Sequence, residues 1–229
     1  MDEITVAEAA HQLGITARRV RALAAAADLA VTRRVGSTLL VDAGSVDRWN
    51  RLRAGGTGGG RPWSPAVAWA AIAALADVDA PWMAADQRSR LDTRLRNVTA
   101  QELVAKLRRR AVVRRFAGVN RLNRPAPGAV PTGGYALADG ERAGRFRLVA
   151  GAGAWDSYCA RTDLAAVVAE LRLYPSSRPN HTLRVVEDAQ WLDVANATEP
   201  VLIAIDLTES KSVRERSAGI RFLEGVLKS

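Results

Sequence analysis

Residues 4–25 read ITVAEAAHQLGITARRVRALAA, and this stretch decides the fold of the N-terminal part of the chain. Thr5 and Glu8 have the spacing of a capping box, in which a hydroxyl and a carboxylate satisfy backbone N–H groups at the start of a helix. The apolar residues that follow recur with helical periodicity until Gly14, a residue typical of helix ends. Thr16 is a suitable N-cap for the next helix. The stretch therefore predicts two short helices joined by a tight turn.

The second of these helices has one apolar face and one face that carries arginines. At about 100° per residue, Val20 and Leu23 point inward, while Arg18 and Arg21 point the opposite way beside Ala22. Small residues allow a helix to approach the floor of the major groove closely, where arginines can contact guanine or phosphates. We therefore expect this helix to bind double-stranded DNA. The alternative is a domain used for protein contact, whose arginines are merely solvated.

A hairpin follows the second helix. Two strand-like runs, residues 32–35 and 38–41, flank a two-residue turn that begins with Gly36. Arg33 and Arg34 lie on the first run, where we expect them to contact the phosphate backbone beside the groove. A short helix that extends to about residue 53 closes the domain. The residues expected to bind DNA are Thr16, Arg18, Arg19, Arg21, Arg33, Arg34, Ser37 and Thr38.

Residues 4–53 resemble the MerR-like and excisionase-like winged helix-turn-helix domains. The segments TVAEAA, LGIT, RRVR, the VG of the hairpin and DRW carry the resemblance, because they occur in the family's order. It implies a DNA-binding domain whose second helix enters the major groove. The sequence departs from the family at two places. The family has a Gly and a basic or aromatic residue between the second helix and the wing, and a basic residue after the hairpin Gly, whereas this sequence has Ala26, Ala27, Asp28 and Ser37 in that region. This departure implies a weaker wing contact and base-specific binding that requires a homodimer.

Composition favours a polyanionic partner and excludes several other classes of protein. The chain has 229 residues and a formal net charge of +9, and the basic surplus falls on residues 1–124. The single Cys159 excludes an internal disulfide, so we expect a cytoplasmic protein. The most apolar stretch, residues 65–76, is too short to cross a bilayer, so no membrane partner is expected.

The chain divides into residues 1–53, a Gly-rich linker at 54–62, and a second domain at 63–229. We expect the linker to let the first domain reorient. In the second domain, the patterns predict helices at 65–76, 84–97, 99–109, 163–172 and 213–227, and strands at 145–149, 183–187 and 201–207, with mainly loops at 121–144. The predicted fold class is α+β: a winged helix-turn-helix, a helical segment and a mixed α+β domain that serves dimerisation or partner binding.

The densest positive charge lies where the helix at 99–109 passes into a strand. Arginines gathered there could form a second basic surface that follows phosphates or RNA. Alternatively, they offset the dipole of the helix C-terminus and are otherwise solvated. The residues of this candidate surface are Arg108, Arg109, Arg110, Arg114 and Arg115.

We expect no enzyme, cofactor or metal site. His11 falls on the polar side of the first helix, and His181 in a polar segment, so both are interpreted as surface residues. Cys159 in a predicted strand is interpreted as a small buried hydrophobe. The glycines at 55–60 lack the Lys-Ser/Thr pair of a phosphate-binding loop.

The second domain resembles the C-terminal region of AbiEi-like antitoxins from actinobacterial toxin-antitoxin pairs. The carrying segments are GRPWSPAVAWAAIAAL, LRRRAVVRRF, LRVV at 183–186 and IAIDLTESKSVRERSAGIRFL. The resemblance implies a transcriptional repressor of its own operon, bound to operator DNA and paired with a nucleotidyltransferase-like toxin. Two alternatives stay open: an antitoxin that acts mainly by direct toxin or RNA antagonism, and an excisionase-type recombination accessory factor.

Overall fold

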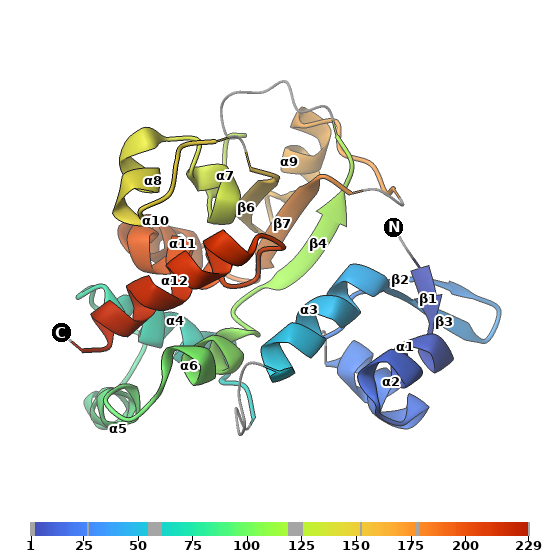
Figure 1. The fold of residues 1–229 in the computed structure, drawn as a ribbon, viewed down its shortest axis with the longest axis horizontal. Coiled ribbons are helices and arrows are strands. Elements are labelled where there is room, and N and C mark those ends of the chain that lie inside the picture. The colour runs from blue at the N-terminus through green and yellow to red at the C-terminus, as the bar shows by residue number, and fades with distance from the viewer. Residues whose placement is uncertain are drawn as a thin grey trace.

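The computed structural model describes residues 3–26, 28–54, 61–118, 126–151, 153–176 and 179–228. Figure 1 shows an N-terminal lobe, residues 3–54, beside a C-terminal lobe, residues 61–228. The buried apolar side chains of the N-terminal lobe form a core of their own, separate from those of the C-terminal lobe. The glycines of the expected linker at 55–60 lie outside the described residues.

The N-terminal lobe contains three helices and a small antiparallel sheet. In chain order its elements are β1 (Glu3–Thr5), α1 (Val6–Leu13), α2 (Ala17–Ala25), β2 (Val31–Val35), β3 (Thr38–Asp42) and α3 (Ala43–Ala54). The strand order is β1-β3-β2, so β2 is an edge strand. The expected order of two helices, a hairpin and a closing helix is confirmed.

Local sequence signals produce these elements. The Thr5 backbone N–H donates to Glu8 Oε2 at 2.7 Å, and the Glu8 N–H donates to Thr5 Oγ1 at 3.2 Å, which completes the expected capping box. The bonds that the Thr5 N–H and the Thr5 hydroxyl donate to the Glu8 carboxylate lower the pKa of Glu8. Gly14 ends α1 with φ 61°, and Gly36 turns the hairpin with φ 58°. Glycine adopts this left-handed conformation without a Cβ clash.

The C-terminal lobe begins with three helices: α4 (Pro65–Leu75), α5 (Ala85–Leu95) and α6 (Ala100–Leu107). Trp69 of α4 is fully buried, and its Nε1 donates to the Arg110 carbonyl at 3.0 Å. Thr99 and Glu102 form the expected capping box of α6. The buried helix predicted at 65–76 is thus confirmed as α4.

A four-stranded mixed sheet forms the other part of this lobe. Its strands are β4 (Val112–Phe116), β5 (Ala129–Pro131), β6 (Trp155–Ala160) and β7 (His181–Val186). They lie in the order β4-β7-β6-β5, so β4 is an edge strand. β6 and β7 are parallel, and α9 (Leu164–Glu170) lies between them in the chain, as such a crossover requires. The other two pairings are antiparallel.

The lobe contains five further helices in its described part. They are α7 (Gly133–Ala136), α8 (Gly140–Arg145), α10 (Gln190–Ala197), α11 (Glu199–Leu207) and α12 (Val213–Val226). Of these, α7 and α10 contact the sheet at β6. Residues 201–207 of α11 are all buried, and α12 packs against this helix. At Gly219 of α12, a Cβ would lie 2.4 Å from the Ala204 carbonyl oxygen, so the two helices require a glycine there.

Three secondary-structure predictions were wrong. Residues 201–207 form a buried helix instead of a strand, because a short apolar run is compatible with either, and Pro200 in its first turn favours the helix. Residues 145–149 form the end of α8 and a turn in which Arg147 has φ 56°. The described part of 121–144 contains β5, α7 and most of α8, where mainly loops were expected.

The fold is α+β, as expected, with helices and strands in both lobes. Within the described residues, no helix combines the length and apolar character needed to cross a membrane.

Candidate nucleic-acid interface

The turn between α1 and α2 fixes the start of α2. The Ile15 N–H donates to the Ala10 carbonyl at 3.0 Å, which follows from the left-handed conformation of Gly14. Thr16 then accepts from the Arg19 N–H at 3.2 Å and caps α2. Val20 and Leu23 anchor the other side of α2 in the core of the lobe. The helix is therefore held in one orientation.

The outward face of α2 is exposed and cationic. Arg18, Arg19 and Arg21 are exposed, together with the small side chains Ala22 and Ala25. None of the three arginines forms an ion pair with any part of the chain that the structure describes. Figure 1 shows α2 at the lower edge of the N-terminal lobe. The face expected to meet DNA is thus uncovered, and its contact with DNA stays a prediction.

The hairpin carries two arginines, of which one pairs with a carboxylate. Arg34 is exposed, as are Ser37 and Thr38 at the turn. Arg33 is also exposed, but its Nη2 lies 2.9 Å from Glu3 Oε2 on β1. The hydrogen bond from Arg33 lowers the pKa of Glu3. Arg33 is thus partly neutralised, and Arg34 is the stronger candidate for a phosphate contact.

A cleft of about 430 Å³ lies between α2 and the C-terminal lobe. Arg19 lines it from α2, and Arg61, Arg108 and Arg109 line it from the other lobe. Asp28, whose side chain is buried, accepts from Arg109 Nε at 3.0 Å and Nη2 at 2.8 Å, and from Arg108 Nε at 3.4 Å. The bond to Asp28 raises the pKa of Arg109. Four guanidinium groups and one carboxylate leave the cleft strongly positive.

The five arginines near α6 and β4 do not form one basic surface, which corrects the sequence-based expectation. Arg108 and Arg109 face the cleft beside α2, and Arg114 is exposed elsewhere, on β4. Arg115 donates to Asp42 Oδ2 at 2.9 Å. Arg110 is buried, with 1% of its side chain exposed, because it pairs with acidic groups in the interior.

A buried ionic network surrounds Arg110, and the sequence analysis did not anticipate it. Arg110 bonds to Asp206, to Glu209 at 3.0 Å and to the Tyr158 hydroxyl at 2.7 Å. Arg184 of β7 bonds to Glu209 at 2.9 Å and pairs with Asp206 at 3.0 Å. Three further residues belong to the network. Asp156 pairs with Arg184, and Arg48 pairs with Glu209. The Thr132 hydroxyl donates to Asp206.

One feature of the sequence could have indicated this network: charged residues occur within or at the end of apolar segments. Arg184 interrupts LRVV, and Asp206 ends IAID, positions at which a charge must be paired if the segment is buried. Burial favours a raised pKa for Glu209, but the charges of Arg184, Arg110 and Arg48 outweigh it and hold the pKa well below 4.5. The network is thus a set of paired ions with no exposed reactive group.

Ion pairs connect the two lobes. Arg48 of α3 pairs with Glu209, Arg115 of β4 pairs with Asp42 of β3, and Arg109 pairs with Asp28. In Figure 1, α3 lies against the C-terminal lobe near α6. The expectation that the first domain reorients freely does not fit this arrangement, because reorientation would separate charges that are buried or half-buried.

The two histidines and the cysteine belong to elements other than α2. His11 is exposed, as expected. His181 was expected at the surface but is buried at the start of β7, and burial lowers its pKa. Cys159 is buried in β6, as expected, and burial raises its pKa to about 11.

Comparison of the chain with protein-family models, curated proteins and solved structures finds no match. DNA binding is therefore proposed below from the residues and their arrangement, and the finer proposal from the resemblance described in the sequence analysis.

Proposed function

We propose that the N-terminal lobe is a winged helix-turn-helix domain that binds double-stranded DNA, and that the protein is a cytoplasmic transcriptional regulator. The observation that carries this proposal is the outward face of α2, on which Arg18, Arg19 and Arg21 are exposed beside alanines. Such a face fits the width of the major groove and supplies bidentate donors for guanine. The β2–β3 hairpin is the wing, with Arg34 beside a phosphate.

The cleft beside α2 supports a longer contact with the DNA backbone. Arg61, Arg108 and Arg109 lie along the same cleft as Arg19. Each additional phosphate contact releases counterions and strengthens binding without adding sequence information. The C-terminal lobe therefore adds affinity next to a helix that supplies specificity.

The regulated DNA is proposed to be the operator of the protein's own operon. The resemblance of residues 60–225 to AbiEi-like antitoxins supports this finer proposal, with a nucleotidyltransferase-like toxin as the partner. In this role the C-terminal lobe supplies the surface for dimerisation or toxin binding.

A footprinting experiment tests the proposal. The intact protein is titrated onto the DNA upstream of its own gene, with an excess of unrelated competitor DNA. We expect a protected segment within the promoter, with major-groove guanines shielded from methylation. Protection that the competitor abolishes, or binding without any localised footprint, would show that the protein is not an operator-binding regulator.

A further inference from the structure

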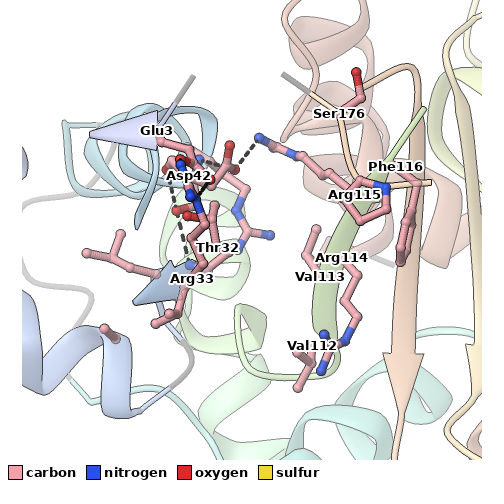
Figure 2. Close-up of a pocket in the computed structure, with 17 residues that line it drawn as sticks. Glu3, Thr32, Arg33, Asp42, Val112, Val113, Arg114, Arg115, Phe116 and Ser176 are labelled. Atoms are coloured by element: carbon pink, nitrogen blue, oxygen red, sulfur yellow. Dashed lines mark hydrogen bonds and ion pairs between the residues drawn. The ribbon is translucent and has the colours of Figure 1, made fainter. Parts of the chain in front are cut away.

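A second groove, of about 790 Å³, lies between the lobes and is distinct from the outward face of α2. It is lined on one side by β2 and on the other by β4, each of which is an edge strand of its sheet. Figure 2 shows Val113 and Arg114 of β4 across the groove from Thr32 and Arg33 of β2. Edge strands have backbone groups that can pair with another chain.

The open edge of β4 can be assigned from its hydrogen bonds. The Phe116 carbonyl accepts from the Asn180 N–H on the β7 side. The Ala117 N–H and carbonyl bond to Tyr174, each at 2.9 Å, on the opposite side. Because backbone groups alternate along a strand, those of Val113 and Arg115 point to the same side as those of Ala117. Within the described residues, no backbone bond satisfies them on that side.

The bridge at Ala117 shows that this edge accepts a chain segment. Residues 174–176 approach β4 there, but Pro175 has no N–H to donate and the pairing does not continue. Val113 and Arg115, further along the edge, are left open. An additional strand would continue the line that Tyr174 begins.

The charged side chains that line the groove indicate the charge of the segment that would bind there. Four arginines line it, but Arg33 pairs with Glu3, Arg115 with Asp42 and Arg48 with Glu209. Arg114 is exposed and forms no ion pair with any described residue. Val31, Val112 and Val113 add apolar surface between these charges. The groove therefore combines backbone donors and acceptors, valines and the positive charge of Arg114, which no described carboxylate neutralises.

We propose that an extended, acidic segment of a partner protein binds this groove as an added β-strand on the open edge of β4. Main-chain bonds to Val113 and Arg115 provide affinity, and Arg114 pairs with an acidic side chain of the segment. This proposal does not require DNA binding, because the open edge of β4 lies apart from the outward face of α2; Arg33 of the hairpin borders the groove as well.

The test uses a fluorescein-labelled, end-blocked peptide of alternating glutamate and valine, titrated against the full chain and followed by fluorescence anisotropy. One control peptide carries N-methyl groups on alternate amides, and another replaces glutamate by lysine. We expect the first peptide alone to bind. A first peptide that does not bind, or N-methylation without effect, would overturn the proposal.

Two variants locate the site. Val113→Pro removes one N–H on the open edge and leaves the bonds to β7 in place, and Arg114→Glu reverses an exposed charge. Each should weaken binding by about tenfold or more, whereas Arg94→Glu, an exposed change on α5, should not.

Unchanged binding in Val113→Pro would contradict the site. If that variant misfolds, amide exchange decides: the peptide should slow exchange at Val113 and Arg115 of the unaltered protein, and unaltered rates would refute the proposal.

Discussion

Arg48 Nη1 of α3 lies 3.2 Å from Oε2 of Glu209, and the two side chains are 11% and 4% exposed. Glu209 also accepts from Arg110 and Arg184, so this single carboxylate joins the N-terminal lobe to the buried ionic network of the other lobe. The position of α2 relative to the C-terminal lobe therefore depends on an interior charge.

Replacement of Glu209 should destabilise the protein strongly. Glu209→Gln keeps the shape but removes the negative charge that three arginines face, and breaking a buried pair of this kind costs about 3–5 kcal/mol. Urea unfolding of the variant measures the change. Glu187→Gln, which removes an exposed pair with Arg161, is the control and should cost less than about 1 kcal/mol. Equal losses in the two variants would show that burial of the network contributes nothing.

The stability of the protein should fall on acidification in a way that depends on Glu209. A carboxylate whose pKa is lower in the folded than in the unfolded state stabilises the fold above its unfolded pKa, near 4.5, and loses this contribution as pH falls through the folded value. Urea unfolding, followed from neutral pH to below 4.5, should show a steeper loss for the unaltered protein than for Glu209→Gln. Parallel curves would mean that Glu209 has an ordinary pKa.

Two glycines of α12 should respond oppositely to alanine. At Gly219 a Cβ would meet the Ala204 carbonyl at 2.4 Å, so Gly219→Ala must push α12 from α11 and should cost about 1–3 kcal/mol. At Gly225 nothing lies within 4 Å, and Gly225→Ala should stabilise the helix by roughly 0.5–1 kcal/mol. Thermal unfolding distinguishes the two, and a stable Gly219→Ala variant would contradict the close approach of the helices.

The helices and the hairpin of the N-terminal lobe could be predicted from short-range sequence signals. The buried ion pairs could not, because they join residues far apart in the chain. Thr5 with Glu8, Gly14 and Gly36 act within a few residues, so their positions could be predicted. Arg110 could not be placed in the same way, because its partner Asp206 is far along the chain and lies on a helix that an apolar run left ambiguous. The sequence shows how many arginines are clustered, but it does not show which of them pair with carboxylates in the fold. The prediction of a second basic surface was wrong for this reason.

Glu3 should restrain the contribution of Arg33 to DNA binding. Glu3→Gln removes the carboxylate that pairs with Arg33 and frees a guanidinium beside Arg34. We expect tighter DNA binding and a steeper salt dependence, by about one unit in the slope of log K against log salt if one phosphate contact is gained. The fluorescence anisotropy of labelled upstream DNA at several salt concentrations measures both. An unchanged slope would place the hairpin away from the DNA.

The most direct test of the central claim is the affinity of α2 variants for upstream DNA and for a scrambled duplex. If Arg18 and Arg21 read bases, alanine at either should cost about 1–3 kcal/mol on the upstream DNA and much less on the scrambled duplex, so that specificity falls. Arg94→Ala, which removes an exposed charge from α5, should leave the specificity ratio unchanged. Full specificity in both α2 variants would contradict the proposal that this helix reads DNA.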